Sequence, residues 1–216
     1  MILDLLNEIN KLNIILGSTS PRRIEYLSKL GLEFKIEASK FEENLDKSLY
    51  KTPIDYCCDT SKHKTEEVFN RLKNDDMPSS ILIGADSIVV KGQTIFEKPK
   101  SVDDAKQMLR QLSASTHQVC TSVTIIAYNS STKIIVQRNF YVLTEVEFDE
   151  ISDSLINHYI ENCKPFDKAG SYGIQEVPAS SFIKKINGDF YNVTGLPIHQ
   201  LSKELREVYI SCFNIK

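Results

Sequence analysis

The chain has 216 residues, of which 41% are hydrophobic and 25% are charged, and its formal net charge is -3. This length and composition are typical of one globular domain, and they exclude disordered, collagen-like and disulfide-rich classes. The small negative charge argues against a broad basic surface for nucleic acid, so we expect no nucleic-acid partner. Any site for a polyanion must therefore be local.

The cysteines and the N-terminal residues indicate a cytoplasmic protein. The five cysteines are an odd number and lack CxxC spacing, which favours neither a zinc site nor a disulfide framework. The N-terminal segment carries Asp4 and Glu8 and has neither the basic region nor the cleavage site of a signal peptide. No apolar run approaches the roughly 20 residues that a membrane span requires, so we expect no membrane partner.

The first part of the chain is predicted to form a helix, a strand and a second helix. Apolar residues at helical spacing predict a short amphipathic helix over residues 1–12, an extension that precedes a single domain over 13–216. An apolar strand is expected at 13–16. Ser20 is expected to cap the next helix, and Pro21 suits its first position because proline has no N–H to leave unpaired.

The remaining elements are also predicted to alternate. A helix around 54–72 is expected to begin at Thr52-Pro53, and residues 81–90 are predicted to form a central strand. Asn187-Gly188 predicts a hairpin because both residues tolerate positive φ. The other predicted elements are a helix capped by Ser101 and Asp104, strands at 119–128 and 134–148, a helix over about 149–162 and a final helix from Pro197. The class is therefore α/β with a mixed sheet and flanking helices.

The segment Gly17-Ser18-Thr19-Ser20-Pro21-Arg22-Arg23 indicates a phosphate site. It places hydroxyls, backbone N–H groups and two guanidinium groups at the start of a helix that comes after a strand. A helix N-terminus favours anions, and arginine binds phosphate oxygens through two points. The candidate ligands are Ser18, Ser20, Arg22 and Arg23, and the alternative is a capped surface helix with solvated arginines. The segment matches neither the P-loop nor the GxGxxG pattern.

Asp86 interrupts the apolar run 81–90, and a buried carboxylate requires a cation or several donors. Magnesium is usually held by one or two carboxylates together with substrate phosphates, so Asp86 with an acid such as Glu42 or Glu43 suffices. The alternatives are an acid that binds backbone N–H groups at a strand end, and two glutamates on a solvated face.

Two later segments add candidate ligands. Lys98 is fixed ahead of a proline and is placed to meet a phosphate, although most lysines are solvated. In the loop 167–175 two glycines permit close approach of the backbone, so Lys168 and Gln175 are expected to face a ligand unless the loop is simply flexible. Gln175 is suited to a nucleobase edge. The histidines show no metal-ligand spacing, and no nucleophile motif supports covalent catalysis.

Taken in order, these segments resemble the Maf family of nucleotide pyrophosphatases from about residue 13 to residue 208. The shared motifs are Ser-x-Ser-Pro-Arg-Arg, Gly-Ala-Asp-Ser-Ile-Val-Val, Glu-Lys-Pro, Leu-Ser-x-x-x-His-Gln-Val, Asp-Lys-Ala-Gly-Ser-Tyr-Gly-Ile-Gln and Val-Thr-Gly-Leu-Pro. The resemblance implies a fold like that of inosine triphosphate pyrophosphatase, with two lobes around a central cleft. It also implies a homodimer that hydrolyses nucleoside triphosphates between the α and β phosphates with Mg²⁺ or Mn²⁺.

The resemblance also implies roles for individual residues. Asp86 holds the metal or takes a proton from the attacking water, and Glu43 assists at the metal. The residues implied to neutralise charge on the triphosphate are Arg23, Lys64 and Lys98. The helix around Lys64 departs from the alanine-rich sequence usual in the family, so Lys62 is an alternative to Lys64.

Three positions are similar to the branch of the family that prefers dTTP and UTP, namely Arg22, Ser87 and Gln175. Ser87 stands where that branch usually has threonine, and the lost methyl group is worth about 1 kcal/mol of discrimination. The resemblance therefore implies a dTTP/UTP pyrophosphatase that sanitises the nucleotide pool. The alternatives are a 7-methyl-GTP pyrophosphatase, a non-catalytic nucleotide-binding regulator of cell division, and a plain phosphatase that releases orthophosphate.

Overall fold

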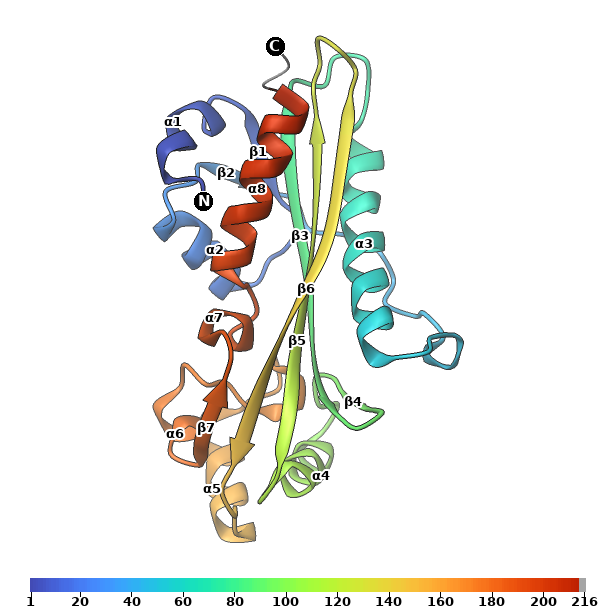
Figure 1. Ribbon diagram of the computed structural model, residues 1–216. Coiled ribbons are helices and arrows are strands. Elements are labelled where there is room, and N and C mark those ends of the chain that lie inside the picture. The colour runs from blue at the N-terminus through green and yellow to red at the C-terminus, as the bar shows by residue number, and fades with distance from the viewer. Residues whose placement is uncertain (214–216) are drawn as a thin grey trace.

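The computed structural model describes residues 1–213, which form a seven-stranded mixed sheet flanked by helices (Figure 1). The strand order is β2-β1-β3-β5-β6-β7, and β4 pairs with β3. β1 lies parallel to β2 and β3, whereas the other pairs are antiparallel. The strands are β1 (Asn13–Leu16), β2 (Phe34–Ile36), β3 (Ser80–Lys91), β4 (Thr94–Phe96), β5 (Thr116–Tyr128), β6 (Ile135–Phe148) and β7 (Ile183–Asn187). The mixed α/β class is confirmed, and residues 214–216 of the expected domain lie outside the described part.

Helices cover both faces of the sheet. α3 (Pro53–Leu72) packs on β3 and β5, and α8 (Ile198–Phe213) packs on β5 and β6 from the opposite face (Figure 1). The other α-helices are α1 (Leu6–Ile9), α2 (Pro21–Lys29), α4 (Val102–Leu112), α5 (Asp153–Cys163), α6 (Val177–Ser180) and α7 (Phe190–Val193). Three 3-10 turns are η1 (Leu3–Leu5), η2 (Lys47–Leu49) and η3 (Ala169–Ser171).

The long strands β3, β5 and β6 connect two apolar clusters at the two ends of the molecule (Figure 1). At one end, residues of β1, α2 and α8 pack with β3 and β5. At the other end, α4 and α5 contribute Leu109 and Ile156, which pack with Phe148. Between these clusters β3 changes from large apolar residues to Gly84-Ala85-Asp86-Ser87. The small residues there allow another element or a ligand to approach the strand closely.

The hairpin expected at Asn187-Gly188 is wrong. β7 pairs with β6, and the segment after β7 forms the helical turn α7. Asp189 caps this turn by accepting a hydrogen bond from the backbone N–H of Tyr191 at 2.8 Å, and its own N–H donates to Thr144 Oγ1 at 3.0 Å. Gly188 has φ 136°, so the expected turn with positive φ is present. The chain continues from this turn into a helix and not a strand, because Asp189 caps α7.

The start of α3 agrees with its sequence signals. Thr52 Oγ1 accepts from the N–H of Asp55 at 3.1 Å, and the Asp55 carboxylate accepts from the N–H of Thr52 at 3.1 Å. This reciprocal cap satisfies two donors that a helix start leaves unpaired. α3 then lies against β3 at Gly84, where an added Cβ would be 3.0 Å from the Thr65 Cβ and would collide with its hydroxyl. Glycine therefore permits the close approach of this helix.

Replacing Gly84 with alanine is expected to lower the free energy of unfolding by about 1–3 kcal/mol, because α3 must move away from β3 or distort. Urea unfolding of Gly84→Ala against the unmodified protein measures this loss. Gly17→Ala is the matched control, since a Cβ there would be 3.5 Å from its nearest neighbour, an ordinary contact. Equal stabilities of the two variants would contradict the steric argument.

His117 on β5 is buried in the cluster that contains Phe148. Its Nε2 lies 2.7 Å from the hydroxyl oxygen of Tyr172. Burial, together with the positive charge of Lys91, lowers the pKa of His117 to about 4. The unfolded chain binds this proton near pH 6.5, so the stability contributed by the neutral imidazole is present above about pH 6.5 and is lost as the pH falls toward 4.

We expect the unmodified protein to lose about 2 kcal/mol more unfolding free energy than His117→Gln between about pH 7.5 and pH 5. The physical reason is that the unfolded state takes up a proton that the folded state excludes. Urea unfolding of both proteins at the two pH values isolates this contribution, because other titrating groups are common to both. Parallel pH dependences would show that the buried histidine is not responsible.

Candidate functional site

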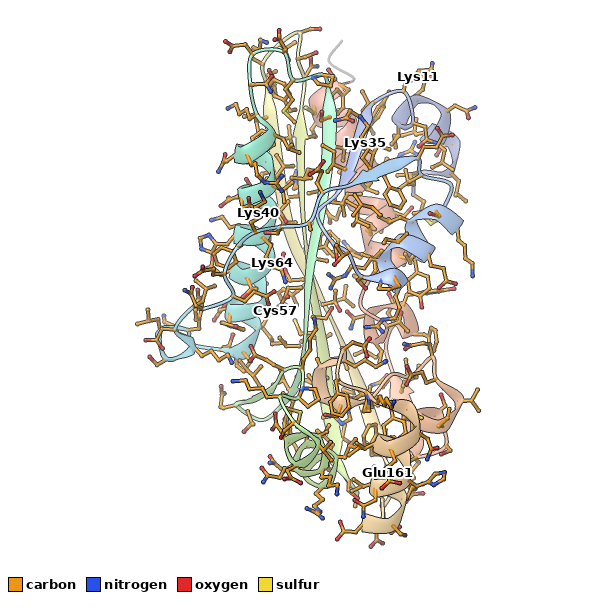
Figure 2. The ribbon with its side chains drawn as sticks, turned by 180° about the vertical axis from the view of Figure 1, so that it is seen from behind. Lys11, Lys35, Lys40, Cys57, Lys64 and Glu161 are labelled. Atoms are coloured by element: carbon orange, nitrogen blue, oxygen red, sulfur yellow. The ribbon has the colours of Figure 1, made fainter. Side chains whose placement is uncertain are left out.

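A cleft of 580 Å³ lies beside the middle of β3, between the two apolar clusters. It is bounded by the segment after β1, by α3 and by the loop that precedes α6. Figure 2 shows Lys64 on α3 beside β3. The structure brings together eleven residues predicted from the sequence, whereas the alternatives Glu42 and Lys62 do not line the cleft. The eleven residues are Ser18, Ser20, Arg22, Arg23, Glu43, Lys64, Asp86, Ser87, Lys98, Lys168 and Gln175.

Asp86 occupies the centre of the cleft and is only 9% exposed. Its Oδ1 accepts a hydrogen bond from Lys64 Nζ at 3.1 Å, and the same amine lies 2.8 Å from Glu43 Oε1. Among the described residues, Oδ2 has only the Cys57 thiol as a partner, at 4.0 Å. Burial raises the pKa of Asp86, although the positive charges of Lys64 and Arg23 act to lower it. One oxygen of this carboxylate is therefore without a strong donor.

Lys64, and not Lys62, is placed to contact a phosphate. Burial alone would lower the pKa of Lys64, but the negative charges of Asp86 and Glu43 raise it above its ordinary value, so the amine stays charged. Lys62 lies outside the cleft and lines a separate surface hollow with Asp59. The two lysines are two positions apart on a helix and so point in different directions.

Arg23 joins three parts of the cleft. Its Nε donates to the carbonyl of Gly195 at 3.0 Å, and its Nη1 donates to the carbonyl of Ala85 at 2.7 Å and to Ser18 Oγ at 3.2 Å. Its Nη2 donates to Ser87 Oγ at 3.1 Å. Burial lowers the pKa of Arg23, which nevertheless remains a cation because arginine titrates so high. Most of its donors are used within the protein, so it supplies charge and holds two serines in place.

Ser20 and Arg22 lie at the N-terminus of α2, where a phosphate is favoured. The expected cap by Ser20 is wrong, because its side chain makes no hydrogen bond to the helix. Ser20 has the extended backbone of a cap residue, but its side chain lines the cleft. Arg22 Nε donates to the carbonyl of Thr194 at 3.1 Å, and its Nη1 lies 3.5 Å from Asp167 across the cleft. Ser20 is thus left for a ligand.

The loop before α6 is organised by Lys168, which is 8% exposed. Its Nζ lies 2.6 Å from Asp167 Oδ1 and 2.8 Å from Glu176 Oε1. Burial would lower the pKa of Lys168, but these two carboxylates raise it. A Cβ on Gly173 would be 2.9 Å from the Lys168 stem, so glycine allows the loop to fold over this side chain and to place Gln175 in the cleft. The charge of Lys168 is already paired.

Lys98 is an exposed cation at the mouth of the cleft, and among the described residues it forms no hydrogen bond or ion pair through its side chain. Glu97 beside it was not predicted as a site residue. Its Oε1 accepts from the Tyr56 hydroxyl at 3.1 Å, and its Oε2 lies 2.7 Å from Lys47 Nζ. Thr194 and Gly195 were also missed, since they act through backbone carbonyls. All three belong to the motifs Glu-Lys-Pro and Val-Thr-Gly-Leu-Pro, which were the available signals.

Within residues 1–213 no group of three or more His, Cys, Asp or Glu side chains is arranged to hold a metal ion. Asp86 and Glu43 meet at one amine, however, and Asp86 has an oxygen without a strong donor. One or two carboxylates are the usual protein share of a magnesium site that also uses substrate phosphates. The donor set therefore fits such a metal. No helix in this part of the chain is long and apolar enough to cross a membrane.

Comparisons with known proteins identify the family of this chain. The family model described as Maf-like protein matches residues 13–208. The chain is 57% identical to a nucleoside triphosphate pyrophosphatase of Dictyostelium discoideum over 88% of each chain. It is 45% identical to a dTTP/UTP pyrophosphatase of Cytophaga hutchinsonii, over 94% of this chain and 88% of that one.

Among solved structures, a nucleoside-triphosphatase described as a dITP/XTP pyrophosphatase from Mycobacterium abscessus matches 93% of this chain and 96% of its own. The TM-score is 0.37 and the identity is 8%, so this likeness carries no argument. The match of the family model over residues 13–208 and the identity to both curated relatives are decisive. The chain belongs to the Maf family.

Proposed function

We propose that this protein hydrolyses dTTP and UTP to the monophosphate and pyrophosphate with a divalent metal ion. The observation that carries the proposal is the convergence of a buried carboxylate, Asp86, with the cations Lys64, Arg23 and Lys98 in one cleft. A triphosphate requires such a concentration of positive charge, and an acid among the cations has a use in handling water or metal. The choice of substrates is supported by the names of relatives such as the Cytophaga hutchinsonii protein.

Asp86 and Glu43 are the residues that would hold Mg²⁺ or Mn²⁺ together with the phosphates. When bound, the ion would supply charge neutralisation on the phosphates and lower the pKa of a water molecule. Burial raises the pKa of Asp86, and the positive charge of Lys64, which joins the two carboxylates, opposes this rise. The chain thus places two carboxylates beside one cation where the metal would bind.

Different side chains accept the proton of the water and neutralise the charge of the phosphates. Attack of water on the α phosphorus forms a new P–O bond and breaks the bond to the oxygen that bridges to the β phosphorus, so pyrophosphate leaves. Asp86 is placed to accept the proton of the water. Lys98 and the α2 N-terminus, with Ser20 and Arg22, neutralise the leaving pyrophosphate. Arg23 adds charge and positions Ser18 and Ser87.

Base selection is assigned to Gln175, which lines the cleft on the folded loop around Lys168. An amide both donates and accepts hydrogen bonds, which matches the edge of uracil or thymine. Ser87 supports the same branch, since its hydroxyl accepts from Arg23 and lies 2.9 Å from Thr121 Oγ1. The hydroxyl at this position therefore links Arg23 to Thr121 on β5. The nucleotide-sanitising role, the cytoplasmic location and the homodimer expected from the sequence stay predictions.

Product analysis tests the proposed function. The purified protein is incubated with Mg²⁺ or Mn²⁺ and, separately, with dTTP, UTP, CTP, GTP, ATP and 7-methyl-GTP, and the products are resolved by phosphorus NMR. We expect monophosphate and pyrophosphate chiefly from dTTP and UTP, and none in the presence of EDTA. Orthophosphate as the first product would indicate a phosphatase. Turnover confined to 7-methyl-GTP would show that this nucleotide, and not dTTP or UTP, is the substrate. No turnover with any nucleotide would favour the binding regulator.

Gln175→Glu is expected to reduce the preference for UTP over CTP, measured as the ratio of kcat/KM values, by about tenfold or more, because a carboxylate cannot donate to the base. Competition assays with both nucleotides measure the ratio directly. Gln200→Glu, on α8 outside the cleft, is the charge-matched control and should leave the ratio unchanged. An unchanged ratio in Gln175→Glu would remove this residue from base selection.

A further inference from the structure

Glu43 lies on a segment without regular structure, residues 37–46, which links β2 to η2 and which we call the strap. In Figure 2 the strap leaves the edge of the sheet near Lys35, crosses in front of β3 and reaches α3 past Lys40. The Glu43 side chain is 54% exposed, so packing around it does not fix its position. Another part of the molecule must hold the strap if Glu43 is to meet Asp86 reproducibly.

Glu67 on α3 binds the strap directly. Its Oε2 accepts a hydrogen bond from the backbone N–H of Lys40 at 2.7 Å and another from Ser39 Oγ at 3.1 Å. Its Oε1 accepts from Arg71 Nε at 2.9 Å. Burial would raise the pKa of Glu67, but the donors from Lys40, Arg71 and Ser39 lower it. The carboxylate is therefore ionised and fully engaged, which makes these charge-assisted bonds strong.

Arg71 completes the contact from the next turn of α3. Its Nη2 donates to the carbonyl of Ala38 at 2.9 Å, and its Nη1 lies 3.3 Å from Glu37 Oε2. Arg71 and Glu67 are each about three-quarters buried, so their pairing is less screened than that of exposed charges. Together they bind four successive strap residues, and we call the pair the clamp.

The clamp and the catalytic end of the strap use the same face of α3. Lys64, which binds Glu43, precedes Glu67 by one helical turn, so both side chains face the strap. Between the two contacts, Phe41 stacks on His63 with ring centroids 5.3 Å apart and an interplanar angle of 16°. The strap is thus laid along α3 in one register. A shift at the clamp would move Glu43 relative to Lys64 and Asp86.

We propose that Glu67 is a positioning residue, which with Arg71 fixes the strap on α3 so that Glu43 lies beside Lys64 and Asp86. The inference rests on the proposed function, because it assumes that Glu43 takes part in hydrolysis. Glu67 itself lines no part of the cleft and touches no reacting group. Glu67 acts through residues 38–43. Because the clamp already orders this irregular segment, less conformational entropy is lost when Glu43 takes up its position in the transition state.

The test is a double-mutant cycle in UTP hydrolysis. We expect Glu67→Ala to lower kcat by about tenfold to a hundredfold, since misplacement by about 1 Å costs this much. In a Glu43→Ala background the same substitution should change kcat by less than about twofold, because no acid is left to position. Glu67→Gln keeps an acceptor for the Lys40 N–H and should retain more activity than Glu67→Ala. Glu66→Ala is the control, since Glu66 accepts from Gln137 on β6, away from the strap.

Hydrogen exchange of the protein without nucleotide or metal gives a readout separate from activity. Amides of residues 37–46 should exchange about tenfold faster in Glu67→Ala than in Glu66→Ala. Unchanged exchange of the strap, unchanged kcat in Glu67→Ala, or an equal loss in both backgrounds would each overturn the proposal. A kcat in Glu43→Ala equal to that of the unmodified protein would also overturn the proposal. That result would show that Glu43 takes no part in hydrolysis, which the other outcomes would not show.

Discussion

The arrangement of the cleft depends on one buried carboxylate in the middle of a central strand that is almost entirely buried. Asp86 interrupts a strand that is otherwise apolar, and its burial costs free energy unless cations lie near it. Lys64 from α3 and Arg23 from α2 supply that charge. Two helices therefore lie close to the same residue, and Gly84 makes the approach of α3 possible.

The elements around the cleft contribute parts of different rigidity. Asp86 and Lys64 are on a central strand and a long helix, and Arg23 is hydrogen-bonded to three segments, so this charged centre is preorganised. Glu43 and Gln175 lie on irregular segments, the first held by Glu67 and Arg71 of α3 and the second folded around Lys168. The charged centre is therefore fixed by regular elements, whereas Glu43 and Gln175 reach the cleft from loops.

Local signals in the sequence predicted the local structure well. The strand at 13–16 and the Thr52 cap were found because each depends on adjacent residues. The hairpin at Asn187-Gly188 failed because the signal specifies a positive φ, whereas the cap by Asp189 and the pairing with β6 decide which element comes after the turn. Ser20 has the backbone of a cap, yet its side chain serves the cleft instead.

The candidate site was predicted as a set of residues but not as a network. The residue types and the family resemblance together identified eleven of the residues that line the cleft. They did not reveal that Arg23 is used mainly within the protein or that Lys168 is paired by two carboxylates. They also missed the clamp, because the contacts of Glu67 with Ser39 and Lys40 join residues far apart in the chain and match no motif.

The most direct test of the central role of Asp86 compares turnover and stability in Asp86→Asn, which keeps the shape of the side chain and removes its charge. We predict that kcat with UTP and Mg²⁺ falls by about a thousandfold or more. The unfolding free energy should change by no more than about 2 kcal/mol, because Lys64 keeps its ion pair with Glu43 and Arg23 keeps its hydrogen bonds to Gly195 and Ala85. Turnover near that of the unmodified protein, in a folded variant, would contradict this role.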